Sequence, residues 1–216
     1  MNTSLPAHAD SRRKLLLAAL RLFAAKGYEG ATTREICDAA GANLSAIRYY
    51  FGDKGGLYRA AFCEPLGEEP DPALLRGLLE LPLPQAFSMF FREFLQPLER
   101  GEEVRLVMKL HFREMIEPTG IWQQEIDTEI RPQHELMVAM LVKTLDLTAP
   151  DADVQRLAIA IVAMAVHFYV GFDVIDVLAP EVLSSPDAIE TLSQRLTGYA
   201  LSMVEGERQR REAACS

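Results

Sequence analysis

The sequence has few cysteines and no long uncharged apolar segment. Its three cysteines, Cys37, Cys63 and Cys215, are too few and too widely spaced for a disulfide framework or a CxxC metal site, so we expect a reducing, cytoplasmic compartment. The longest uncharged apolar run, from Leu157 to Phe172, is shorter than the roughly 20 residues that a membrane-spanning helix needs. No secretory leader pattern opens the chain. These absences predict a protein with no membrane partner.

The sequence also lacks the familiar catalytic signatures. It contains no GxSxG, P-loop or dinucleotide-binding fingerprint. Acidic residues such as Glu102 and Glu103 are adjacent in sequence, and adjacent residues on a helix do not face each other, so they do not form a catalytic carboxylate pair. His111 and Glu114 have an HxxE spacing that could hold a metal in a helical bundle, but no second pair with a partner carboxylate accompanies them. We therefore expect no enzyme activity, no cofactor and no metal.

Charge is distributed unevenly along the chain. The 216 residues are 49% hydrophobic and 25% charged, a composition typical of a globular protein, with a formal net charge of -9. Residues 1–62 contain nine basic and five acidic residues (9 − 5 = +4), so residues 63–216 carry 13 − 26 = −13. This contrast predicts two domains: a small module at 1–62 for an anionic partner, and an acidic body at 63–216.

Apolar residues recur at helical spacing, and alternating β-branched runs typical of strands are absent, so an all-α fold is expected. The five prolines within 64–84 predict a linker or a broken helix there, and the charged tail from Glu205 is expected to fray. The expected helices run approximately over residues 11–26, 32–40, 43–51, 54–63, 85–100, 103–117, 120–146, 151–179 and 187–208.

The second and third expected helices form a helix-turn-helix. Thr32 and Glu35 have the spacing of a capping box, Gly41 begins a short turn, and Asn43 is a suitable N-cap for the next helix. In that helix Ile47 lies on the side expected to face the core. The outer side then presents Leu44, Ser45, Arg48 and Tyr49, a mixture suited to phosphates and base edges in a major groove.

Residues flanking this helix extend the predicted DNA contact. Lys54 lies in the first turn of the fourth helix, where a cation is unfavourable for the helix and a phosphate partner would explain it. Thr33 is either a hydroxyl donor to the backbone or an ordinary helix start, and Tyr50 either contacts DNA or packs on neighbouring helices. The predicted DNA-binding set is Thr33, Asn43, Leu44, Ser45, Arg48, Tyr49, Tyr50 and Lys54.

Residues 11–62 resemble the DNA-binding domain of the TetR/AcrR family of bacterial transcriptional repressors. The matching segments are LFAAKGYEGATTREI, AAGAN, IRYYF and GDKGGLY, in that order, and the NLSAIRYYFGDK stretch is similar to the CecR-like branch. Two positions depart from the family pattern: Arg48, where an aromatic residue often contacts phosphate, and the Gly55-Gly56 pair, which would soften the first turn of the fourth helix.

The resemblance implies that the body dimerises and binds a small effector. In the family the last two helices pair with their copies in a second subunit, and the apolar character of 151–179 and 187–208 agrees, although they could also be the core of one large monomer. A largely apolar effector would lie between the helices expected at 103–117, 120–146 and 151–179. The candidate effector residues, which would equally suit a packed core, are Met108, His111, Phe112, Met115, Trp122, Met164, His167 and Phe168.

The sequence thus predicts an all-α protein with an N-terminal helix-turn-helix domain and a larger helical ligand-binding and dimerisation domain. Its expected partners are a double-stranded, pseudo-palindromic DNA operator, a small-molecule effector and a second copy of the chain. The expected function is transcriptional repression relieved by the effector. The alternative is a helical protein-protein adaptor without DNA binding.

Overall fold

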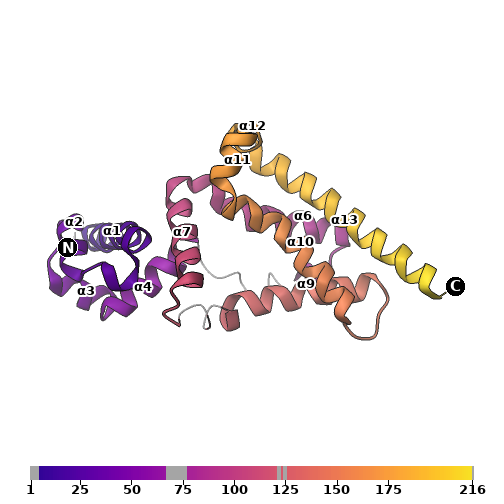
Figure 1. The fold of residues 1–216 in the computed structure, drawn as a ribbon, viewed down its shortest axis with the longest axis horizontal. Coiled ribbons are helices and arrows are strands. Elements are labelled where there is room, and N and C mark those ends of the chain that lie inside the picture. The colour runs from indigo at the N-terminus through magenta and orange to yellow at the C-terminus, as the bar shows by residue number, and fades with distance from the viewer. Residues whose placement is uncertain (1–4, 67–76, 121–122, 124–125, 216) are drawn as a thin grey trace. The chain divides into compact units, whose positions relative to one another are not determined.

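The computed structural model describes residues 5–66, 77–120, 123 and 126–215, and these form helices with no strand among them (Figure 1). The all-α prediction is therefore confirmed. The chain divides into two compact units, one of residues 1–68 with 100–124 and the other of residues 69–99 with 125–216. We refer to them as the N-terminal unit and the body.

The N-terminal unit contains five α-helices and a 3₁₀ turn in its described residues. The first helix begins at Leu5, earlier than expected. Gly27, where the sequence predicted its end, has a φ of 76° and kinks the helix, which continues to Gly30. The elements are α1 (Leu5–Gly30), α2 (Thr33–Ala40), α3 (Leu44–Phe51), α4 (Lys54–Cys63), η1 (Glu64–Leu66) and α7 (Glu102–Ile116).

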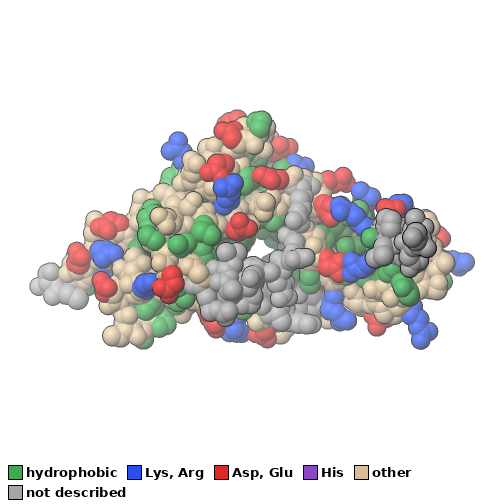
Figure 2. Space-filling view, turned by 180° about the vertical axis from the view of Figure 1, so that it is seen from behind, with side chains coloured by type: hydrophobic (Ala, Val, Ile, Leu, Met, Phe, Trp, Pro, Cys, Tyr) green, Lys and Arg blue, Asp and Glu red, His purple; other side chains and the backbone are tan. Residues whose placement is uncertain are grey.

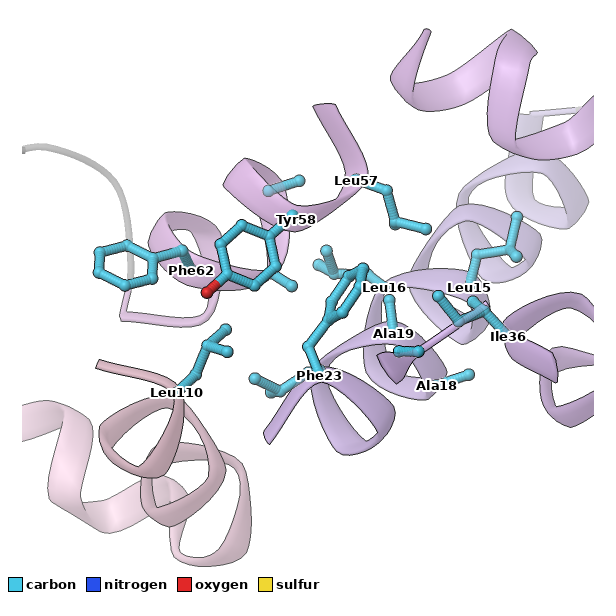
Figure 3. Packing of buried hydrophobic residues seen from close by; sticks show 14 of the residues in the cluster. Leu15, Leu16, Ala18, Ala19, Phe23, Ile36, Leu57, Tyr58, Phe62 and Leu110 are labelled. Atoms are coloured by element: carbon cyan, nitrogen blue, oxygen red, sulfur yellow. The ribbon is translucent and has the colours of Figure 1, made fainter. Parts of the chain in front are cut away.

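Helix α7 belongs to the core of this unit. Val107 and Leu110 of α7 are fully buried in the same apolar cluster as Phe23 of α1 and Phe62 of α4 (Figure 3). The compact unit therefore extends beyond the predicted 1–62 module, because three short helices and α1 leave an apolar side that α7 covers.

The body consists of two long helices and several shorter ones. Helix α13 packs along α6 and α10, and α10 also packs on α9 (Figure 1). The described elements are α6 (Leu83–Leu95), η2 (Gln96–Arg100), a π-helical turn η3 (Ile126–Ile130), α9 (Arg131–Thr144), α10 (Ala152–Val170), α11 (Phe172–Leu178), α12 (Glu181–Ser184) and α13 (Ala188–Cys215).

The single helix predicted over 151–179 is wrong. It breaks at Gly171, whose N–H donates to the carbonyl of His167 at 2.7 Å, and α11 starts at the next residue. A Cβ at position 171 would lie 2.8 Å from the His167 ring, so the imidazole occupies the space that a side chain would need. The apolar periodicity continues through both helices and carries no sign of this break.

The prediction of a frayed tail is also wrong, because α13 continues to Cys215. Arg211 makes two hydrogen bonds to Asp151, at 2.8 and 2.9 Å, and Arg210 bonds Asp153 at 2.8 Å. Glu207 accepts from both arginines. The aspartates that order the tail lie about 60 residues earlier in the chain, so the sequence of the tail alone does not predict these ion pairs.

Helix α10 is long and apolar enough to cross a membrane by length and composition alone, as are many core helices of globular proteins. One face of it is buried within the body. The buried residues are Val154, Ala158, Ile161, Ala165 and Tyr169.

Candidate nucleic-acid interface

The turn between α2 and α3 is fixed by caps at both of its ends. Thr32 and Glu35 form the predicted capping box, with Glu35 N–H donating to Thr32 Oγ1 at 3.2 Å and Thr32 N–H donating to Glu35 Oε2 at 3.0 Å. Gly41 ends α2 with a left-handed φ of 63°, and Asn43 caps α3 by accepting from Ala46 N–H at 3.1 Å. The helix-turn-helix predicted from the sequence is present.

Helix α3 has one buried and one exposed side, as predicted. Ile47 is 3% exposed, whereas Leu44 is 56% and Tyr49 75% exposed, and Ser45 and Arg48 are exposed as well. Leu44 and Tyr49 therefore lie on the same solvent-accessible side of α3 as Ser45 and Arg48. An open depression on this side is lined by Asn43, Ser45, Ala46, Arg48, Tyr49 and Tyr50.

Tyr50 lies between the core of the N-terminal unit and the open side of α3. It is half-buried and packs against the core of the N-terminal unit, yet it also borders the open depression on α3. Its ring lies edge-on to Tyr49, with centroids 4.9 Å apart. Tyr50 therefore packs against the ring of the more exposed Tyr49 and restricts its orientation.

Lys54 has a partner that the sequence did not indicate. Its Nζ lies 4.5 Å from the ring centroid of Tyr28 in α1, a cation-π contact that offsets the unfavourable position of a cation at the start of α4. Asp53 caps the same helix by accepting from Gly56 N–H at 2.7 Å. Thr33 is half-buried in the first turn of α2. A phosphate is thus not required to explain Lys54, although the residue remains partly exposed.

The basic residues near the start of the chain are paired with carboxylates. Arg12 bonds both carboxylate oxygens of Glu64, at 2.6 and 2.8 Å, and its guanidinium lies 4.9 Å from the Phe51 ring centroid. Lys14 pairs with Asp10 at 2.6 Å. Blue and red side chains accordingly lie next to each other over this unit at the right of Figure 2. These basic residues form ion pairs with carboxylates of the same unit at its surface, in contrast to Arg48 on α3.

Several residues predicted to bind an effector serve in packing. His111 stacks on Phe62 of α4 with ring centroids 3.7 Å apart, and its Nδ1 donates to the carbonyl of Val107 at 2.8 Å. Burial lowers the pKa of His111 to about 4, so the ring is neutral at pH 7. Met108 is half-buried against the same core, and Phe112 is 40% exposed.

The other candidates are distributed over both units. In α10 of the body, Met164 and Phe168 are half-buried and His167 is exposed. Trp122 and the side chain of Met115 lie outside the described part of the chain. Neither unit by itself brings all eight residues together, so the effector site stays a prediction.

The burial of the Glu114 carboxylate was not predicted from the sequence. This residue of α7 is 1% exposed and accepts a hydrogen bond from the Tyr58 hydroxyl of α4 at 3.0 Å. It also accepts from the Thr119 hydroxyl and from the N–H groups of Thr119 and Gly120. Only the HxxE spacing with His111 drew attention to it, and that spacing suggested a metal. Among the described residues no cluster of His, Cys, Asp and Glu suited to a metal is found.

Comparison with known proteins agrees with this geometry. Residues 15–61 match the family model described as "Bacterial regulatory proteins, tetR family", and residues 83–206 match the C-terminal domain of the "HTH-type transcriptional dual regulator CecR". The second match alone covers more than half of the chain. The chain belongs to the TetR family. Residues 83–206 are of the CecR type, the branch to which the NLSAIRYYFGDK stretch is similar.

One curated relative matches nearly the whole length of this TetR-family regulator, and solved structures share its fold. The dual regulator CecR of Shigella flexneri is 26% identical over 212 residues, covering 93% of this chain and 94% of the relative. The structure of NalD, the secondary repressor of the MexAB-OprM efflux pump in Pseudomonas aeruginosa, is similar with a TM-score of 0.63 at 19% identity, covering 91% and 97%. The Bacillus subtilis regulator FadR, solved with stearoyl-CoA, has a TM-score of 0.59 at 14% identity, covering 88% and 98%.

Membership decides the class of function. The chain is a DNA-binding transcriptional regulator and not an enzyme, because this family consists of regulators that recognise DNA through the N-terminal helix-turn-helix. An adaptor without DNA binding is not favoured. The solvent-exposed side of α3 is the part of the structure suited to that contact.

Proposed function

We propose that this protein is a cytoplasmic, homodimeric repressor that binds a pseudo-palindromic operator and leaves it when a small, largely apolar effector binds. The observation on which this rests is the exposed side of α3, where Leu44 and Tyr49 are uncovered beside Arg48. Side chains of these types read base edges and contact phosphates in the major groove.

The two ends of α3 supply different contacts in this proposal. Leu44 and Ser45 in its first turn would approach base edges, because residues near the start of a recognition helix enter the groove. Arg48 and Tyr49 would contact the backbone or a guanine edge. Thr33 and Lys54 flank α3 at the starts of α2 and α4, where unpaired backbone amides favour phosphate oxygens.

The test is fluorescence anisotropy of the purified protein on labelled DNA from upstream of its own gene, with a scrambled DNA as control, over a salt series. Preferential binding to the first DNA, with affinity falling steeply as salt rises, supports the proposal. Arg48→Ala is expected to weaken binding, whereas Arg92→Ala, an exposed arginine on α6, should leave it unchanged. Equal binding to both DNAs, or none at low salt, would contradict operator recognition.

Dimerisation is supported by an uncovered apolar side on α10 and α13. Ile159 of α10 is 60% exposed and Tyr199 of α13 is 57% exposed. Gly198 and Gly206 lie on the exposed side of α13, and a Cβ at either position would meet no atom within 4 Å. Small residues beside an exposed aromatic ring allow a second helix to approach closely, as in the four-helix interfaces of two-fold dimers.

The dimer is tested by sedimentation velocity of Tyr199→Asp. In a two-fold interface each substitution occurs twice, so this variant is expected to shift the protein toward monomer and to lose operator affinity. Ile116→Asp, at a residue of α7 that is 79% exposed, is the matched control and should sediment as the unsubstituted protein does. A dimer that tolerates Tyr199→Asp would place the interface elsewhere.

Effector release requires that the ligand bind the DNA-incompetent conformation better than the competent one. A hundredfold loss of operator affinity needs about 2.7 kcal/mol of coupling. We propose that α4, which lies between α3 and the body in the chain, transmits the conformational change caused by the effector. Its movement would hold the recognition helices α3 of the two subunits at the wrong spacing for the operator. Titration of apolar small molecules into the protein-DNA complex tests this, since a true effector lowers anisotropy at the operator and binds the free protein more tightly.

A further inference from the structure

Four side chains connect the predicted phosphate contact to the interior of the N-terminal unit. The ammonium of Lys54 lies 4.5 Å from the ring centroid of Tyr28, and the Tyr28 ring meets the Tyr58 ring edge-on with centroids 5.0 Å apart. The Tyr58 hydroxyl donates to Oε2 of Glu114 at 3.0 Å. We call Lys54, Tyr28, Tyr58 and Glu114 the tyrosine relay. It joins α4, α1 and α7 through contacts distant in sequence.

The inner end of the relay is rigid. The carboxylate of Glu114 is 1% exposed and, besides Tyr58, accepts from the Thr119 N–H at 2.7 Å, the Thr119 hydroxyl at 2.9 Å and the Gly120 N–H at 3.1 Å. A buried carboxylate with this many donors has little freedom to move. Burial and the adjacent carboxylate raise the pKa of the Tyr58 phenol, so its hydroxyl keeps its proton and donates.

The middle of the relay is held by packing. Tyr58 is 1% exposed and meets the Phe23 ring edge-on, with centroids 4.9 Å apart and an interplanar angle of 87°. Figure 3 shows Tyr58 between Phe23 and Phe62, with its hydroxyl directed away from Leu57. The hydrogen bond to Glu114 fixes where the phenol end of Tyr58 lies, and packing against Phe23 restricts the rotation of its ring. The Tyr28 ring rests on this fixed ring.

The outer end is the flexible one. A lysine ammonium has four rotatable bonds behind it, and the Tyr28 ring is the contact that restricts where it lies. The same ring approaches the backbone of α4, since a Cβ at Gly55 would lie 3.7 Å from the Tyr28 hydroxyl. Tyr28 therefore places both the start of α4 and its first charged side chain.

We infer that Glu114 is a positioning residue for DNA binding: through Tyr58 and Tyr28 it places the Lys54 ammonium for a backbone phosphate. The inference rests on the proposed function, because it presupposes that Lys54 contacts DNA. It makes operator affinity depend on a carboxylate of α7 that does not touch DNA. A displacement of the last turn of α7 would accordingly change the phosphate contact at Lys54.

The first test removes one atom from the relay. Tyr58→Phe in the full-length protein deletes the hydroxyl, while Glu114 keeps its donors from Thr119 and Gly120, so the variant is expected to fold. On DNA from upstream of its own gene, its affinity should fall at least about threefold, with a shallower dependence on salt. Glu117→Gln is the control, because it alters an exposed residue directly after α7 that is not part of the relay, and it should leave both quantities unchanged.

The second test asks whether Tyr58 acts through Lys54. In the Lys54→Gln background, Tyr58→Phe is expected to cause no further loss of affinity, because the ammonium that it positions is gone. If the two losses multiply, Tyr58 acts independently of Lys54 and the relay is refuted. A merely structural weakening would also multiply, and it would leave the salt dependence of Tyr58→Phe unchanged.

The remaining outcomes are distinguishable. If Tyr58→Phe does not fold by circular dichroism, Glu114→Gln takes its place in both tests, since the amide keeps the size of the side chain and one acceptor oxygen. Failure of the unsubstituted protein to prefer the upstream DNA contradicts the proposed function and the relay together. Normal binding with multiplicative losses contradicts the relay alone.

Discussion

Gly56 offers a sharp test of the packing between α3 and α4. A Cβ built on Gly56 would lie 2.0 Å from the carbonyl oxygen of Phe51, far inside any real contact and against backbone that cannot rotate away. At Gly55 the nearest atom is Oδ1 of Asp53 at 3.2 Å, which belongs to a side chain. The two adjacent glycines therefore differ in what they tolerate. The sequence suggested instead that both merely soften the helix.

The expected effects on stability differ in size. Gly56→Ala must push the start of α4 away from the end of α3, at a cost near the upper end of overpacking, about 3 kcal/mol. The higher helix propensity of alanine stabilises the helix by about 1 kcal/mol, so the free energy of unfolding should fall by about 2 kcal/mol in total. For a chain of this length that lowers the Tm by about 4–8 °C. At Gly55 the Asp53 oxygen that caps α4 must shift by a few tenths of an ångström, which offsets the gain in helix propensity, so Gly55→Ala should be close to neutral.

The assay is thermal unfolding by circular dichroism at fixed protein concentration, together with operator binding for both variants. Because α4 begins directly after the recognition helix, Gly56→Ala should also lose affinity for DNA, whereas Gly55→Ala should keep it. A Gly56→Ala protein as stable as the unsubstituted one, with unchanged DNA binding, would refute the close approach of Phe51 to α4.

Three further predictions follow from the ion pairs and the exposed surfaces. The Arg211 guanidinium, together with backbone N–H groups at the start of α10, holds the pKa of the Asp151 carboxyl well below its usual value. This ion pair therefore stabilises the fold above about pH 4, and the stabilisation is lost as the pH falls further. The Asp151→Asn variant should unfold at a lower temperature than the unsubstituted protein at pH 7, and at the same temperature in strong acid. Arg48→Ala should reduce the salt dependence of DNA binding, whereas Arg12→Ala, which removes the ion pair with Glu64, should mainly lower the Tm. Tyr199→Phe keeps the ring on α13 and should remain dimeric by sedimentation, in contrast to Tyr199→Asp.

The helix-turn-helix could be predicted closely because its signals are local. Thr32, Glu35 and Asn43 cap helices within three residues of themselves, and such bonds form wherever the short sequence allows them. The exposed side of α3 followed from the position of Ile47, since a helix with one buried residue leaves its opposite side to solvent. These are properties of eight to ten consecutive residues.

The interior of the N-terminal unit could not be predicted in the same way. The HxxE spacing of His111 and Glu114 suggested a metal ligand pair, but the two side chains contact Phe62 and Tyr58 of a different helix. Nothing in the residues around position 114 specifies a tyrosine 56 positions earlier in the chain. For the same reason the ion pairs that order the end of α13 were not foreseen.

The sequence by itself determined the helical class, the caps of the helix-turn-helix, the outward side of α3 and the family, because these depend on residues a few positions apart or on a continuous motif. Only the tertiary structure decided that α7 packs with the N-terminal helices, that Lys54 rests on Tyr28, and that Gly56 is needed for the approach of Phe51. Those features arise when segments distant in the chain bury a common surface, and the free energy of that burial belongs to no single segment.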